Sequence, residues 1–130
     1  MKIDSNGLIA ALRASWAADT AFDAADWNPE NPARGHCLVS ALVAQDYLGG
    51  DLQRYEVEGS GLNEVHHVNL LDHGAVLDTT ASQYVGTIRL TPIPTSLKGF
   101  TSIRDRRLAD ESTRRRYEIL KARVQSVLIQ

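Results

Sequence analysis

One segment constrains the fold more than any other, because it is apolar on nearly every side. Residues 37–48 read Cys-Leu-Val-Ser-Ala-Leu-Val-Ala-Gln-Asp-Tyr-Leu, and two glycines follow at positions 49 and 50. Glycine readily adopts the left-handed backbone conformation that ends a helix, so the pair is a good stop signal. A helix with almost no polar face is one that its domain surrounds. The sequence therefore predicts a central buried helix with Cys37 in its first turn.

The size and composition of the chain fit a single domain over residues 1–130. Hydrophobic residues make up 43% of the 130 positions and charged residues 23%, which is ordinary for a globular domain. The single cysteine excludes an internal disulfide. No apolar run approaches the roughly 20 residues of a membrane span, and the first residues lack an export signal. We therefore expect no membrane association and a cytoplasmic location.

Helices are expected at both ends of the chain. A first helix is predicted over residues 5–16, with Ile9, Leu12, Ala14 and Trp16 on its apolar face. A C-terminal amphipathic helix is predicted from about Asp110, since apolar residues recur there at spacings of 3, 4 and 3: Tyr117, Leu120, Val124 and Val127.

The middle of the chain favours short strands and irregular segments. Strands are predicted at residues 52–57, 65–71 and 75–78, and another near 85–90. Residues 19–36 and the rest of 79–103 are expected to be irregular, because each proline disfavours helix in the residue before it. Trp16 and Trp27 are interpreted as core anchors around the first irregular segment.

Positive charge is concentrated at the C-terminal end, where residues 98–130 hold nine of the fourteen Lys and Arg residues. This cluster suits either a phosphate, carboxylate or acidic partner, or a solvated helix face with i,i+4 ion pairs. It lacks the interleaved aromatic residues on which bases stack, and the formal net charge is −2. We therefore expect no nucleic acid among the partners. The arginines of the cluster are Arg104, Arg106, Arg107 and Arg114–Arg116.

Cys37 is the strongest chemical candidate. Backbone N–H groups at a helix start stabilise a thiolate and can also hold the oxyanion of a tetrahedral intermediate. A cysteine nucleophile needs a histidine base and a third group that orients the histidine. His66 or His67 and then Asp78 supply these residue types. The alternative is an inert core cysteine.

The register of one predicted hairpin decides between the two histidines. A three-residue loop of Asp72, His73 and Gly74 places His66 diagonally beside Asp78 on the same face. A two-residue loop would shift the register and place His67 and Asn69 there instead. Glycine at the third loop position favours the first arrangement, and therefore His66.

Several segments resemble the YunG family of small bacterial proteins. They are Arg34-Gly35-His36-Cys37 with the following helix to Gly50, His66-His67-Val68-Asn69, Val76-Leu77-Asp78, and Gln83-Tyr84. The resemblance covers roughly residues 15–85 and places the family's cysteine, histidine and aspartate on Cys37, His66 and Asp78. It implies a fold similar to papain-like and transglutaminase-like proteins, with a central helix packed on an antiparallel sheet.

The chain departs from the family pattern at two places. The family usually has glutamine at the position of His36 and aromatic residues at those of His67 and Val68. Of the other candidates, Asn31 and His36 are possible oxyanion or substrate contacts, and Asn69 would orient the histidine in the shifted register. No metal site is expected, because no zinc-type spacing occurs and adjacent strand histidines point to opposite faces.

The sequence thus predicts an α+β domain that hydrolyses or transfers the acyl group of a small amide or peptide through Cys37, His66 and Asp78, without a cofactor. The alternative is a non-catalytic binding module that retains the fold.

Overall fold

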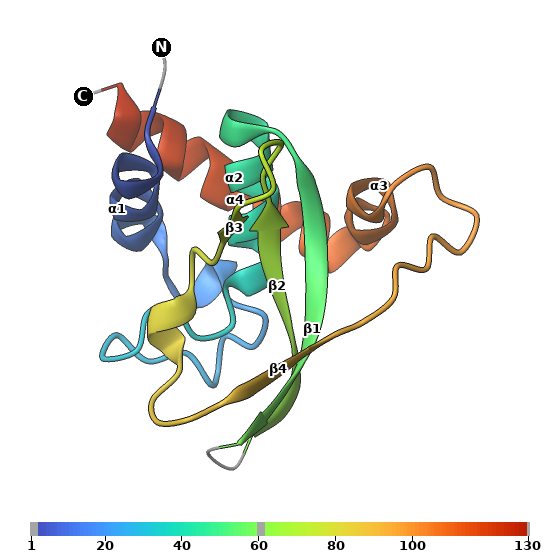
Figure 1. Cartoon of the computed structure of the whole chain (residues 1–130). Coiled ribbons are helices and arrows are strands. Elements are labelled where there is room, and N and C mark those ends of the chain that lie inside the picture. Colours follow the sequence, from blue (N-terminus) through green and yellow to red (C-terminus); the bar gives the residue numbers. More distant parts are fainter. Residues whose placement is uncertain (1–2, 60–61, 130) are drawn as a thin grey trace.

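The computed structural model describes residues 3–59 and 62–129 (Figure 1). Within these ranges the chain forms four α-helices, four strands and two short 3-10 helices. In chain order the elements are α1 (Ser5–Ser15), η1 (Ala18–Thr20), α2 (Cys37–Leu48), β1 (Asp51–Gly59), β2 (Leu62–Leu70), β3 (Val76–Leu77), η2 (Ala81–Gln83), β4 (Arg89–Pro92), α3 (Ile103–Leu108) and α4 (Glu111–Leu128).

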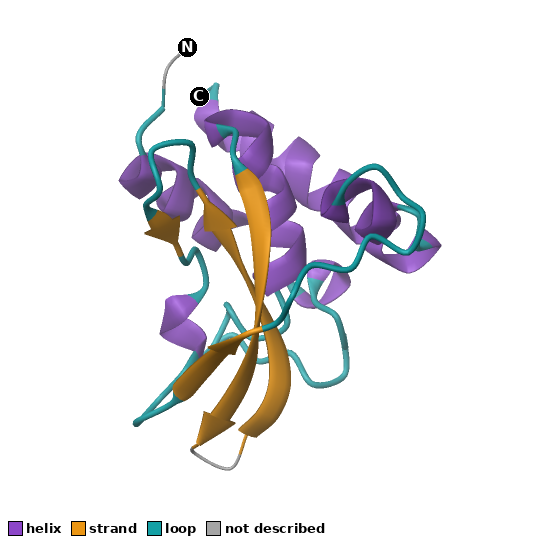
Figure 2. Ribbon diagram, turned by 45° about the vertical axis from the view of Figure 1, so that its right-hand side comes forward, coloured by secondary structure: helices purple, strands orange, loops and turns teal. Residues whose placement is uncertain are grey.

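The strands form one antiparallel sheet in the order β3-β2-β1-β4. β1 and β2 pair along their whole length, whereas β3 pairs only with Asn69 and Leu70 of β2. The sheet is strongly twisted, and the α-helices gather on one side of it (Figure 2). The predicted α+β class with a small antiparallel sheet is confirmed.

The apolar segment forms the predicted central helix. In α2, Val39 and Ala41–Ala44 are completely buried, and the helix packs against β2 and α4. The helix ends at the twin glycines, and both have positive φ. Gly50 lies so close to β2 that an added Cβ would stand 2.2 Å from the Leu70 carbonyl oxygen, so no other residue fits there.

The first helix exists, but its buried face differs from the predicted one. Packing against α4 buries a stripe at helical spacing: Leu8, Ala11, Leu12 and Ser15. Ile9 is only half-buried and Ala14 is exposed. Leu12 and Trp16 of the predicted set are buried, but Ala14 is not, because residues 12 and 14 do not share a helix face.

The segment after β3 contains two further differences. The strand expected near residues 85–90 lies at Arg89–Pro92, where it pairs with β1 as an edge strand. The helix α3 was not predicted, since its six residues are too few for a periodic pattern. It begins at Ser102, whose side chain accepts a hydrogen bond from the Asp105 backbone N–H.

The C-terminal helix starts after the cap residue Asp110 and buries Tyr117, Leu120 and Val124, as predicted. Arg114 and Arg115 are exposed, but Arg116 is buried. The interpretation of the whole arginine cluster as a solvated face is therefore wrong for Arg116, because its side chain lies over an internal cavity described below.

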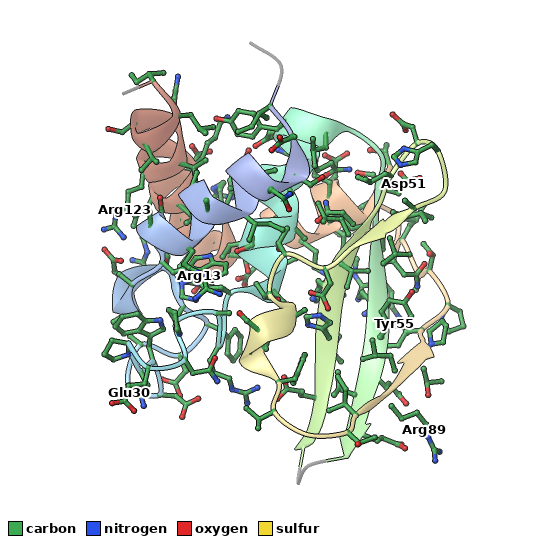
Figure 3. The ribbon with its side chains drawn as sticks, turned by 60° about the vertical axis from the view of Figure 1, so that its left-hand side comes forward. Arg13, Glu30, Asp51, Tyr55, Arg89 and Arg123 are labelled. Carbon is green, nitrogen blue, oxygen red and sulfur yellow. The ribbon has the colours of Figure 1, made fainter. Side chains whose placement is uncertain are left out.

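Contacts between distant segments join the layers. Arg13 of α1 donates a hydrogen bond to Ser82 of η2 at 3.2 Å, and Arg123 of α4 pairs with Asp19 (Figure 3). Tyr55 and Arg89 lie on the strands, away from α1. Among the described residues, none of the helices combines the length and the apolar character that crossing a membrane requires.

Candidate active site

The hairpin between β2 and β3 has the register that Gly74 predicted. Leu71 N–H donates to the Ala75 carbonyl at 2.8 Å, and Gly74, with φ of 88°, closes the three-residue loop. The pairs Asn69–Leu77 and Leu70–Val76 continue this register. Asp78 follows β3 directly, and its carboxylate accepts a hydrogen bond of 2.8 Å from His66 Nε2.

His66 is completely buried on one face of β2. The edge of its ring meets the face of Tyr84 with centroids 5.1 Å apart, and Asp78 is itself held by the Thr80 backbone N–H at 3.2 Å. His66 Nδ1 is also buried, and no hydrogen-bond partner for it lies among the described residues. The ring is thus fixed at Nε2 and free at Nδ1.

The surroundings of His66 favour its charged form. Burial alone would lower its pKa, but the hydrogen bond to Asp78 and the interaction with Cys37 outweigh burial and raise the pKa to about 9. Because Nε2 is bound to Asp78, Nδ1 is the nitrogen that remains for Cys37. His66 is thus hydrogen-bonded to Asp78, and its Nδ1 is the atom that could face a thiolate.

His67 lies on the opposite face of β2 and also contacts the cysteine. Its Nδ1 is 3.8 Å from Cys37 Sγ. Burial, and then the positive charges of Arg107, Arg54 and His66, lower the pKa of His67 to about 3. Of these two histidines, His66 is therefore the one whose surroundings favour a cationic ring.

The start of α2 presents Cys37 together with backbone donors. The first intrahelical bond runs from Ser40 N–H to the His36 carbonyl, so the N–H groups of residues 37–39 precede the helical ladder. His36 occupies the N-cap position but its side chain makes no cap bond. The Cys37 N–H therefore remains suited to an oxyanion.

His36 has a structural environment. It is fully buried, and burial lowers its pKa to about 4. In the neutral ring, Nδ1 donates to the Arg34 carbonyl at 3.2 Å and Nε2 accepts from the Thr20 hydroxyl at 2.7 Å. Both ring nitrogens are thus engaged away from Cys37, and the ring lies 5.5 Å from that of Trp16.

The other two secondary candidates also bind backbone carbonyls. Asn31 Nδ2 donates to the Gln83 carbonyl at 3.1 Å. Asn69 Nδ2 donates to the Ala41 carbonyl at 2.9 Å and so ties β2 to α2. With the observed register, Asp78 and not Asn69 lies against the histidine.

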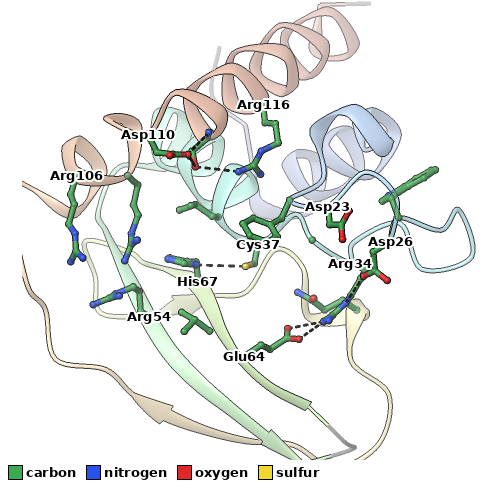
Figure 4. Close-up of a pocket in the computed structure, with 18 residues that line it drawn as sticks. Asp23, Asp26, Arg34, Cys37, Arg54, Glu64, His67, Arg106, Asp110 and Arg116 are labelled. Carbon is green, nitrogen blue, oxygen red and sulfur yellow. Dashed lines mark hydrogen bonds and ion pairs between the residues drawn. The ribbon is translucent and has the colours of Figure 1, made fainter.

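A cavity of about 690 Å³ opens beside Cys37 (Figure 4). One wall carries the ion pair between Arg34 and Glu64, with a shortest N–O distance of 2.6 Å, and Tyr84 donates to the same Glu64 carboxylate at 3.0 Å. His67 and several arginines form the other side. The site is therefore a pocket with the thiol on its wall.

Sequence reasoning missed part of this pocket. Arg34 lines the pocket and belonged to a segment that resembles the YunG family, as did Tyr84, which contacts the lining residue Glu64; nothing marked Glu64 and Arg54. Trp16 is in the core as predicted. Trp27, the second expected core anchor, is only half-buried and lines the cavity, because its indole is held at the loop by the Pro32 carbonyl at 3.1 Å.

Within residues 3–59 and 62–129, no three His, Cys, Asp or Glu side chains are grouped in a way that would hold a metal ion.

Comparison with known proteins places the chain in a family. The model of the family described as YunG protein matches residues 4–129. The "Uncharacterized protein YunG" of Bacillus subtilis (strain 168) is 34% identical over 85 residues, which are 65% of this chain and 67% of that protein. No solved structure matches. The chain belongs to the YunG protein family.

Proposed function

We propose that the protein is a cysteine-dependent amide hydrolase or acyl transferase that acts on a small amide or peptide. Cys37 is the nucleophile, His66 the acid and base, and Asp78 the group that orients His66. One observation carries the proposal: Asp78 accepts a hydrogen bond of 2.8 Å from His66 Nε2, and His66 Nδ1 is buried with no hydrogen-bond partner among the described residues. Asp78 thus selects the tautomer with its lone pair on Nδ1.

The proposed likeness to papain-like and transglutaminase-like enzymes rests on the order of these elements. The nucleophile stands at the start of a central helix, and the histidine and aspartate follow on β2 and directly after β3. That order supports a shared arrangement of the three groups.

The chemistry needs no group beyond these residues. The Cys37 thiolate attacks the amide carbonyl carbon, and the Cys37 N–H binds the oxygen as it becomes negative. His66 donates its Nδ1 proton to the amine nitrogen as the C–N bond breaks, which leaves a thioester. Nδ1 then takes a proton from water, the hydroxyl forms the new C–O bond and the C–S bond breaks. An amine in place of water gives acyl transfer.

The test is the rate of Cys37 alkylation by iodoacetamide between pH 5 and 9. We expect fast labelling of the wild type at pH 6.5 and a loss of about tenfold or more in His66→Ala, because the imidazolium that stabilises the thiolate is gone. Asp78→Asn should lose less. His67→Ala should keep the wild-type pH profile.

The matched control is His73→Ala, which removes an exposed histidine from the hairpin loop and should leave the rate unchanged. If the wild-type rate follows an ordinary thiol with a midpoint near about 8.5, or if the folded protein is not labelled, the enzyme proposal fails and the binding-module alternative stands. If the wild type is labelled as expected, it is then screened for amine release from small amides, with Cys37→Ser as the inactive reference.

A further inference from the structure

Positively charged side chains gather at one end of the cavity beside Cys37. Arg54 of β1 is the cross-strand partner of His67, and Arg107 extends from α3. Both line the cavity, as does Arg106 (Figure 4). Three guanidinium groups from two elements distant in sequence thus converge on the end of the pocket that holds His67.

These arginines lack carboxylate partners in the described part of the chain. None of the ion pairs there includes Arg54, Arg106 or Arg107. Arg106 donates to the Ser96 carbonyl, whereas Arg107 Nε is buried with no hydrogen-bond partner. Burial and then the nearby charges of Arg54 and Arg106 lower the pKa of Arg107, so its neighbours disfavour its charge.

The acids that line the cavity are engaged elsewhere. Glu64 pairs with Arg34, and Asp26 lies 3.9 Å from the same guanidinium. Asp110 caps α4 through the backbone N–H and the hydroxyl of Thr113, both at 2.9 Å, and Asp23 accepts from the Ala25 N–H. Among the described residues, none of these carboxylates therefore forms an ion pair with Arg54, Arg106 or Arg107.

His67 adds a second, independent sign of an unfilled contact. Its side chain lines the cavity and the residue is 93% buried, since 7% of its surface is exposed. Nδ1 contacts Cys37, but Nε2 is buried and has no partner among the described residues. A ligand that reaches Arg54 and Arg107 would lie near this nitrogen, which donates to an anion in the neutral tautomer that carries its proton on Nε2.

We infer that the end of the cavity formed by Arg54, Arg107 and His67 binds an anionic group, a carboxylate or a phosphate, carried by the molecule whose carbonyl meets Cys37. Planar guanidinium groups with several N–H donors suit both anions. The inference deepens the proposed function, since it gives the substrate class: an acyl compound with a negative charge a few bonds from the reacting carbonyl.

The test measures binding rather than turnover, in the Cys37→Ser protein, so it is independent of the nucleophile. The probes are succinate, inorganic phosphate and the neutral succinamide, followed by chemical-shift changes of the arginine Nε–H groups and the backbone amides. We expect saturable binding of an anion that shifts the Arg107 Nε–H signal, and no such shift with succinamide. The anion that binds more tightly, succinate or inorganic phosphate, identifies the group as a carboxylate or a phosphate.

Arg54→Gln and Arg107→Gln should each weaken anion binding about tenfold or more, while the matched control Arg115→Gln, on the exposed face of α4, should change it less than twofold. Two variants keep the test valid if one of them does not fold. Equal binding of succinamide, or equal losses in Arg115→Gln and Arg54→Gln, overturns the inference. If Cys37 alkylation behaves as proposed while no anion binds, only the substrate class fails. If an anion binds while Cys37 proves inert, only the catalytic proposal fails.

Discussion

The two faces of β2 shift the pKa of a histidine side chain in opposite directions. His66 and His67 are adjacent, both are nearly inaccessible to solvent and both lie close to Cys37. On one face a carboxylate accepts from the ring, and the pKa rises to about 9. On the other face burial and two arginines lower the pKa to about 3. The difference comes from the alternation of a strand, which sends neighbours into unlike surroundings.

The two faces also differ in which polar atoms have hydrogen-bond partners. On the face of His66, Asp78 accepts from Nε2 and Tyr84 packs against the ring, so that Nδ1 alone lacks a partner among the described residues. On the face of His67, His67 Nε2 and Arg107 Nε have no hydrogen-bond partner among the described residues. We interpret the first face as the one that prepares the thiolate and the second as the one that receives a ligand.

Removal of Asp78 should change the pKa difference between His66 and His67 more than any other substitution. In Asp78→Asn the carboxylate that opposes the burial of His66 is lost, so its pKa should fall from about 9 to about 6.5 or below, a change of about 3 kcal/mol in the preference for the charged ring. His67 should stay neutral in both proteins. Histidine-selective NMR titration measures both rings. If His66 and His67 titrate together near about 6.5 in the wild type, the asymmetry is refuted.

The two faces should also give stability opposite pH dependences. The folded pKa of His67 lies below the unfolded value of about 6.5, so the unfolded chain binds more protons and stability falls as the pH drops below about 6.5. The folded pKa of His66 lies above it, so its contribution is complete below about 6.5 and is lost as the pH rises through about 9.

Urea unfolding at three pH values measures this effect. Between pH 6.5 and 4.5, His67→Gln should lose about 2–3 kcal/mol less stability than the wild type. His66→Gln should instead flatten the change between pH 6.5 and 9.5. His36 remains in both variants and keeps part of the acid-side loss, because burial lowers its pKa as well. Identical profiles for the two variants would contradict the prediction.

Local rules were enough for the half of the site that lies near one hairpin. The glycine at position 74 determined the loop length, and the loop length determined that Asp78 meets His66. The central helix followed in the same way from its apolar sequence and its two terminal glycines. Both inferences use residues within a few positions of each other.

The positive end of the cavity has no such local signal. Arg54 reaches it from β1 and Arg107 from a six-residue helix that no pattern predicted. Their meeting depends on how α3 and α4 pack across the sheet, which is a property of the tertiary structure. For the same reason, charge counting left two alternatives for the C-terminal arginines, a phosphate, carboxylate or acidic partner and a solvated helix face.

A smaller effect is expected from the contact that ties the face of His67 to α2. Asn69→Ala removes the bond from the buried amide to the Ala41 carbonyl, and the loss of one buried hydrogen bond costs about 1–2 kcal/mol. Because this bond helps to position β2 against α2, the alkylation rate of Cys37 should also fall, by a factor smaller than in His66→Ala. Gln53→Ala is the control, since the Gln53 amide donates to the carbonyls of Arg54 and Ile93 and not to α2. Chemical denaturation and alkylation measure the two effects.

The smallest expected effect is a gain in stability, and it distinguishes two arginines of α3. Arg104 is fully engaged, because it donates to Asp46 at 2.7 Å and to the Leu42 carbonyl at 3.1 Å, whereas Arg107 Nε has no partner in the described structure. Arg104→Gln should therefore destabilise the protein. Arg107→Gln should stabilise it by about 0.5 kcal/mol, since it removes repulsion from Arg54 and Arg106 that solvent only partly screens. Thermal unfolding at low salt compares the two variants. If both variants are less stable than the wild type, Arg107 already has favourable partners in the free protein. The positive end of the cavity would then lack an unpaired guanidinium for an anion.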